Sequence, residues 1–138
     1  GREAAGFQGK KGMRATRLDA VASPLASQTI AELKPLMSRH CMVARTEDGL
    51  AQAAEMVSEL KRRLEHDAEP SVDARAIAAT RRAELSLLSA RALICAMRAR
   101  TESRGSHHRA DFPGKDPAQA RPTSVFLADG EPIARPLA

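Results

Sequence analysis

Residues 46–66 constrain the fold most, because they combine a helix start with an apolar stripe of helical period. Thr46 is a residue type that caps helices, and Glu47 and Asp48 place negative charge in the first turn, where the helix dipole is positive. Small and aliphatic residues then recur at three- and four-residue intervals: Leu50, Ala53, Ala54, Val57, Leu60 and Leu64. This pattern predicts an amphipathic helix that ends near His66 and buries one face.

A second helix is predicted before this one. Ser27 is a candidate N-cap. The apolar residues that follow it at helical spacing are Ile30, Leu33, Leu36, Met37 and Cys41. Pro35 removes one backbone donor, so we expect it to kink the helix or to restart it. The helical pattern ends near Val43 or Ala44.

The longest helix is predicted to start at residues 71–73, after a breaker at residues 67–70. Its stripe holds Ile77, Arg81, Leu85, Leu88, Ala92, Cys95 and Ala99, and it is broadened by Leu87, Ile94 and Met97. A helix that is apolar on more than one side packs against more than one neighbour. We therefore expect this helix to contact both other helices and a surface outside this chain.

These elements predict an all-α fold. Residues 27–113 are expected to form an up-down-up three-helix bundle with short loops, and residues 1–26 a flexible basic arm or linker. Residues 114–138 are expected to form an extended, irregular, proline-rich tail. Within this tail, residues 124–127 are the one strand candidate.

Composition narrows the function classes. The chain has no Trp or Tyr and three Phe, which leaves little material for an aromatic-lined ligand pocket. The net charge of +5 permits nucleic-acid binding, but no aromatic residues accompany the basic ones for base stacking, so a solvated or partner-facing surface is favoured. Cys41 and Cys95 match no metal spacing. No apolar run reaches the roughly 20 residues of a membrane span, and we expect a cytoplasmic protein.

Residues 101–113 follow the longest helix and are dense in polar groups. We expect Gly105 to end that helix in the left-handed conformation that glycine adopts readily. Four side chains could form a metal or acid/base site: Glu102, His107, His108 and Asp111. Their spacing fits no zinc motif, and hydrogen bonds and ion pairs that fix the loop are favoured. Ser103 and Ser106 lie near His107, but no nucleophile elbow is present, which argues against a serine hydrolase.

Part of this segment resembles a known family. The residues that carry the resemblance are Glu102, Ser103, Arg104, Gly105, His107, Arg109, Asp111, Phe112 and Pro113. They resemble the E-S-R-G-x-H-x-R-x-D-F-P signature near the C-terminus of the succinate dehydrogenase/fumarate reductase flavoproteins. Residues 33–38 and 43–46 resemble the family's upstream pattern, and the resemblance covers about residues 28–128.

The resemblance implies an FAD enzyme. The most similar members oxidise L-aspartate to iminoaspartate with oxygen or fumarate as acceptor, at the start of bacterial NAD biosynthesis through quinolinate. The dehydrogenase and reductase members carry a longer tail with Trp and Tyr. In this family the FAD fingerprint and the substrate-binding residues lie in preceding FAD-binding and capping domains, and this chain has no G-x-G-x-x-G motif. We therefore predict no catalytic, cofactor-binding or metal-binding residue in this chain.

The resemblance instead implies a docking role for the signature. The residues expected to fix the domain against its FAD-binding and capping domains are Glu102, Ser103, Arg104, Gly105, His107, Arg109, Asp111 and Phe112. Two alternatives stay open. One is the C-terminal domain of a succinate dehydrogenase/fumarate reductase-type flavoprotein. The other is a free-standing helical interaction subunit, which associates with a separate flavin chain or with itself.

Overall fold

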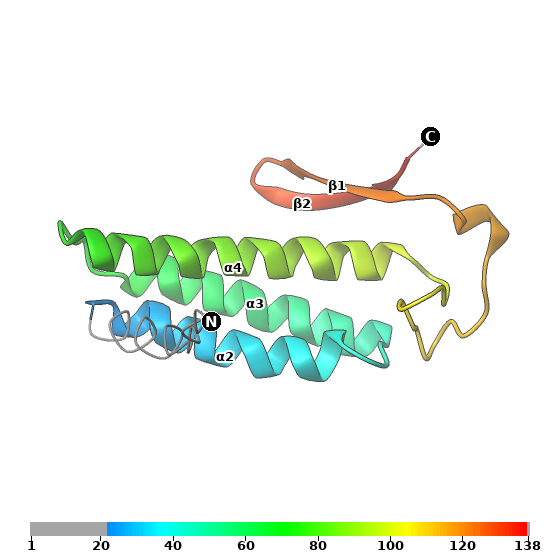
Figure 1. Cartoon of the computed structure of the whole chain (residues 1–138), viewed down its shortest axis with the longest axis horizontal. Coiled ribbons are helices and arrows are strands. Elements are labelled where there is room, and N and C mark those ends of the chain that lie inside the picture. Colours follow the sequence, from blue (N-terminus) through cyan, green and yellow to red (C-terminus); the bar gives the residue numbers. More distant parts are fainter. Residues whose placement is uncertain (1–21, 138) are drawn as a thin grey trace, which may run out of the picture.

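The computed structural model describes residues 22–137, in which three helices are followed by a small sheet (Figure 1). The elements are α2 (Pro24–Cys41), α3 (Glu47–Asp67), α4 (Ala74–Ala99), the 3-10 turn η1 (Pro117–Gln119), β1 (Thr123–Ala128) and β2 (Glu131–Pro136). The helices pack against one another as an up-down-up bundle, as predicted. None of the described helices is long and apolar enough to cross a membrane. Most of the predicted basic arm, residues 1–26, lies outside the described residues.

The helices begin at side-chain caps. Thr46 Oγ accepts a hydrogen bond at 3.1 Å from the amide three residues further on, as expected for the start of α3. The predicted start of α2 at Ser27 is wrong, because the helix begins at Pro24 and Ser23 Oγ accepts from the Ala26 amide. Proline suits the first position of a helix, since its φ is already helical and its missing N–H would have no partner there.

The core lies between the three helices, and α2 and α3 bury the stripes predicted for them. The buried residues of α3 are Leu50, Ala53, Val57, Leu60 and Leu64. In α2, Leu33, Leu36 and Cys41 are buried. Pro35 does not restart α2: one helix continues through it, with the proline on the exposed side.

Helix α4 turns a different face to the core than predicted. Its buried residues are Ala76, Ala79, Ala83, Leu87, Ala90 and Ile94. None of the seven residues of the predicted stripe is buried, and Ile77 and Leu85 are 47% and 62% exposed. Leu87 and Ile94, which were predicted only to broaden the stripe, are buried. Small residues that face larger ones across a helix interface let the two layers interdigitate. The alanines of α4 therefore share the core with Leu87 and Ile94, while other large side chains such as Ile77 and Leu85 lie outside it.

The predicted all-α fold and irregular tail need correction, because β1 and β2 form an antiparallel hairpin. The predicted strand candidate, residues 124–127, lies in β1. Asp129 and Gly130 form the turn with φ of 52° and 79°, the left-handed values that suit hairpin twist. Pro132 and Pro136 lie in β2, although proline in a sequence argues against a strand because it has no N–H to donate. They are tolerated because each strand of a two-stranded sheet has a free edge.

The hairpin packs along α4, on the side away from α2 (Figure 1). Cys95 Sγ donates a hydrogen bond to the carbonyl of Pro132 at 3.3 Å, and Arg91 forms an ion pair with Glu131. Helix α4 thus contacts two helices and a hairpin. This arrangement confirms that α4 packs against more than one neighbour.

Candidate functional site

The polar segment after α4 crosses the end of the bundle where α2 ends and α3 begins (Figure 1). Residues 100–116 are called the signature loop here. Two turns of backbone and two buried charges give this loop its shape. All eight residues predicted to dock the domain lie within it.

Gly105 does not end α4, contrary to the prediction. The helix ends at Ala99, and Arg100 follows it with an extended backbone. Gly105 has a φ of +58° in a tight turn, in which Arg104 and His107 exchange backbone hydrogen bonds at 2.8 and 3.0 Å. No atom lies within 4 Å of the position where a Cβ would be. Glycine is favoured there by the left-handed backbone alone.

Glu102 is the first buried charge of the signature loop, and its side chain is fully buried. It accepts hydrogen bonds from Arg104 Nε at 2.9 Å, from Arg100 Nη1 at 2.6 Å and from the Asp116 amide at 2.7 Å. The Arg104 hydrogen bond, with those from the Asp116 amide and Arg100, lowers the pKa of Glu102 to about 2. The carboxylate therefore stays ionised and is unsuited to general acid/base work near neutral pH.

Arg109 is the second buried charge, and its side chain is also fully buried. Its Nε and Nη2 donate to the two carboxylate oxygens of Asp111, each at 2.8 Å. Its Nη1 donates to the carbonyl of Met97 in the last turn of α4 at 3.1 Å. The guanidinium also lies over the Phe112 ring, 4.9 Å from its centroid. Hydrogen bonds to Asp111 raise the pKa of Arg109, so the guanidinium remains charged.

Asp111 extends this network to the start of α3. Its Oδ2 accepts a hydrogen bond at 2.7 Å from the amide of Glu47, the first residue of that helix. A negative charge is favourable there because the helix dipole is positive at its N-terminus. The bidentate Arg109 contact, helped by the Glu47 amide, holds the pKa of Asp111 well below its usual range. Arg109 and Asp111 therefore join the end of α4 to the start of α3.

Arg45 is a site residue to which the sequence reasoning assigned no role. It is buried between α2 and α3, and its Nε donates to the carbonyl of Cys41 at 2.7 Å. Its amide donates to His108 O at 3.1 Å, and its carbonyl accepts from the Ala110 amide at 2.8 Å. The signal in the sequence is a cation placed just after the end of a helix, where free carbonyls need donors. Arg45 thus fastens the signature loop to the end of α2.

The serine and histidine side chains of the loop bind backbone groups. Ser103 Oγ accepts from the Arg109 amide at 2.9 Å and lies 2.9 Å from the Phe112 carbonyl, to which it can donate. His107 Nε2 lies 3.2 Å from the carbonyl of Arg100, and burial lowers the pKa of His107, so the neutral ring donates there. Ser103 therefore fixes the loop, and the arrangement is not that of a serine nucleophile with a histidine base.

The signature loop holds no metal constellation. Within residues 22–137, no three His, Cys, Asp or Glu side chains are placed to hold a metal ion. Five of the eight residues predicted to dock the domain form two groups. In one, Glu102 pairs with Arg104, and in the other, Arg109 contacts Asp111 and Phe112. The two buried charges of the loop, Glu102 and Arg109, are each matched by an opposite charge. The geometry therefore supports a rigid, self-contained loop.

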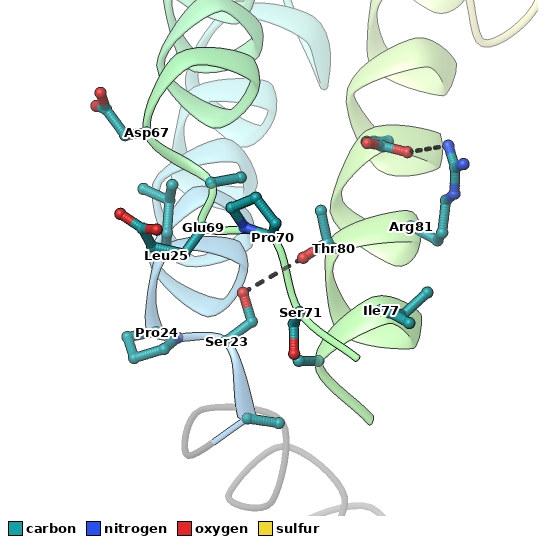
Figure 2. A pocket seen from close by; sticks show the side chains of 14 residues that line it. Ser23, Pro24, Leu25, Asp67, Glu69, Pro70, Ser71, Ile77, Thr80 and Arg81 are labelled. Carbon is teal, nitrogen blue, oxygen red and sulfur yellow. Dashed lines mark hydrogen bonds and ion pairs between the residues drawn. The ribbon is translucent and has the colours of Figure 1, made fainter. Parts of the chain in front are cut away.

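A hollow of about 600 Å³ lies at the opposite end of the bundle, between the start of α2, the α3–α4 loop and the first turns of α4 (Figure 2). Ser23 Oγ and Thr80 Oγ1 lie 3.4 Å apart across it, and Arg81 is paired with Glu84 at its margin. Figure 2 shows the Asp67 side chain pointing away from the serine and threonine. The predicted site residues are all elsewhere, and the polar groups of this hollow form no catalytic arrangement.

Comparison with known proteins identifies the family. Residues 30–133 match the family described as the fumarate reductase flavoprotein C-terminal domain. The chain belongs to this family. It is also 35% identical over 104 residues to the L-aspartate oxidase of Mycobacterium leprae (strain TN). These residues make up 75% of this chain and 18% of that relative. The chain therefore spans less than a fifth of the relative's length. The resemblance given by the signature is confirmed at the level of the flavoprotein family.

The described part of this flavoprotein C-terminal domain does not fit an FAD. A dinucleotide's phosphates need a glycine-rich turn that leads from a strand into a helix N-terminus. The four described glycines lie elsewhere: Gly49 in the first turn of α3, Gly105 and Gly130 in tight turns, and Gly114 in the signature loop. The N-terminus of α3 is already bonded to Thr46 and Asp111. We assign no step of flavin chemistry to residues 22–137.

Proposed function

We propose that this chain is the C-terminal helical domain of an FAD-dependent L-aspartate oxidase. The complete enzyme would oxidise L-aspartate to iminoaspartate in the cytoplasm, as the first step of NAD biosynthesis through quinolinate. FAD and substrate would bind in the FAD-binding and capping domains. The observation that carries the proposal is the 35% identity to an L-aspartate oxidase over 104 residues, a stretch that makes up 75% of the chain.

The role of this domain in the enzyme would be structural. The interactions that support this role are the buried ones of Glu102 and Arg109, whose partners all belong to this chain. The proposed docking residues remain Glu102, Ser103, Arg104, Gly105, His107, Arg109, Asp111 and Phe112. In this view the buried members hold the shape of the signature loop, while exposed ones such as Gly105 and Phe112 touch the FAD-binding and capping domains.

The experiment is flavin spectroscopy on two proteins, the 138-residue chain and the complete polypeptide of which it is proposed to be the C-terminal part. The complete polypeptide should purify with a flavin absorbance that bleaches when L-aspartate is added without oxygen. The 138-residue chain should be colourless. Flavin retained by this chain alone, or a complete polypeptide whose flavin L-aspartate does not reduce, would contradict the proposal.

A second candidate is the C-terminal domain of a succinate dehydrogenase/fumarate reductase-type flavoprotein. The family description, which names fumarate reductase, favours it. The same bleaching experiment separates the two candidates by substrate. Reduction by succinate and not by L-aspartate selects the second.

A free-standing interaction subunit is the third candidate, and it is favoured by the exposed apolar residues on α4. It predicts that the 138-residue chain self-associates or captures a separate flavin chain. Light scattering that shows a monomer, together with a reading frame that continues into an FAD-binding domain, would rule it out.

A further inference from the structure

An apolar groove of about 1070 Å³ runs between α2 and α4. Its walls are Leu33, Met37 and Met42 from the α2 side, and Leu85, Leu93 and Met97 from α4. Leu85, Leu93 and Met42 are 62%, 52% and 63% exposed. Contiguous exposed apolar residues of this size mark interaction surfaces in soluble domains. The expected contact of the third helix with a surface outside this chain falls on this groove.

The other faces of the bundle are already closed or charged. The hairpin covers another side of α4, where Leu127 borders a smaller hollow with Leu64 and Leu88. The α2–α3 face carries the Arg63–Glu32 ion pair at 2.7 Å. Among the residues that line the α2–α4 groove, none belongs to the hairpin. The groove is therefore the apolar face that the described part of the chain leaves open.

Charge around the groove decides between two kinds of occupant. Lys34, Arg81 and Arg82 line it, and no Asp or Glu does. Arg81 is paired with Glu84, which lies outside the lining. A second copy of the chain laid on this face would bring basic residues against basic residues, which is unfavourable. The fitting partner has an apolar ridge flanked by acidic side chains.

We propose that the α2–α4 groove is a second surface, separate from the exposed part of the signature loop, on which this domain docks onto the flavin-carrying part of the same enzyme. The groove receives an apolar ridge of that part, and Lys34 and Arg81 pair with acidic residues beside the ridge. The inference rests on the proposed function, because it needs a flavin-carrying part in the same polypeptide. The relative supports such a part, since this chain matches 18% of its length.

The test compares Leu93→Ser with Met56→Ser. Both residues are 52% exposed and lie within a helix, but Leu93 lies in the groove and Met56 lies on α3 outside it. In the complete polypeptide, Leu93→Ser should raise the rate at which a protease releases this domain by about tenfold or more, because burial of one leucine is lost on docking. Met56→Ser should leave that rate within about twofold of the unmodified protein, as a surface change does.

A charge-reversal pair tests the rim of the groove. Lys34→Glu should speed release of the domain from the complete polypeptide, because it sets like charges against the partner's acidic residues. Arg62→Glu is the matched change on the exposed face of α3, and it should leave the rate of release unchanged. An equal effect of the two reversals would contradict the proposed acidic partner.

The 138-residue chain supplies the remaining control. In this chain, Leu93→Ser and Met56→Ser should have equal small effects on the thermal midpoint. A much larger loss for Leu93→Ser would show that the groove is filled from within the chain, and a dimer abolished by Leu93→Ser would show that a second copy fills it. Either result overturns the inference.

Failure of this inference differs from failure of the proposed function. If the complete polypeptide holds a flavin that L-aspartate reduces, but Leu93→Ser releases the domain no faster than Met56→Ser, the function stands and the docking surface is wrong. If no flavin is present or L-aspartate does not reduce it, the proposed function fails whatever the variants do.

Discussion

The signature loop and the β1–β2 hairpin both follow α4 and both lie against the bundle, but they are held by different forces. The signature loop buries Glu102 and Arg109 completely and matches each with opposite charge. The hairpin lies over α4 with its larger apolar side chains, such as Phe126 and Ile133, still exposed. Among the described residues, the polar contacts that join it to the body of α4 include one ion pair and one cysteine hydrogen bond.

This difference teaches how a loop with little apolar surface becomes rigid. A buried charge is costly unless its hydrogen bonds are satisfied, so the signature loop is stable in the one conformation that satisfies them. The ion pair of the hairpin joins the nearly buried Arg91 to a largely exposed Glu131, so opening the hairpin returns both charges to water.

The largest effect is expected from Arg109→Met, with Arg91→Met as its counterpart beside the hairpin. Arg109→Met should lower the free energy of unfolding by about 3 kcal/mol, the lower end for a broken buried ion pair, since Asp111 keeps some contact with water. Arg91→Met should cost under about 1 kcal/mol, because its partner Glu131 is largely exposed. Chemical denaturation of both variants measures the two losses, and equal losses would erase the proposed difference between the regions.

The next effect concerns pH and Glu102. Its carboxyl has a pKa of about 2 in the folded chain and about 4.3 when unfolded. Its contribution to stability is therefore present above about pH 4.3 and is lost as the pH falls toward 2. Glu102→Gln should be less stable than the natural chain at pH 7, and the gap should narrow as the pH falls through this range. A gap that is independent of pH would mean that the charge of Glu102 does not stabilise the loop.

A smaller effect is expected from the loop glycines. Gly105→Ala should cost about 1 kcal/mol, because a Cβ is strained at a φ of +58° although space is open around it. Gly114→Ala is the matched control, since its surroundings are equally open and its φ is not left-handed, so it should be neutral or slightly stabilising. Thermal unfolding of the two variants measures the difference, and equal midpoints would show that the turn is not held in the left-handed form.

Sequence reasoning predicted the helices better than it predicted how they face one another. The cap at Thr46 and the apolar stripe of α3 were both visible, because α3 has one apolar face. Helix α4 is apolar on several sides, and the helical spacing counted from Ile77 places Leu85 in the core, whereas Ala83 is buried instead. Only the neighbouring helices decide that small residues are needed there.

The signature loop was predicted as a polar segment fixed by hydrogen bonds and ion pairs, but its partners were not. Arg109 contacts the Met97 carbonyl, and Asp111 contacts the Glu47 amide. Both contacts depend on how three chain segments meet at one end of the bundle. Spacing along the sequence does not contain this information. The hairpin was missed for another reason: Pro132 and Pro136 argue against a strand unless the sheet is known to have free edges.

The most direct measurement of the central claim is native-state hydrogen exchange of the 138-residue chain. The amides of Ala110 and Asp116 are bonded to Arg45 and to Glu102 in the signature loop. These amides should exchange only through global unfolding, with the same free energy of opening as the core amides of α4, while the cross-strand amides of β1 and β2 should open at lower free energy. Loop amides that exchange as readily as those of the hairpin would contradict the claim that buried charge makes the signature loop part of the rigid core.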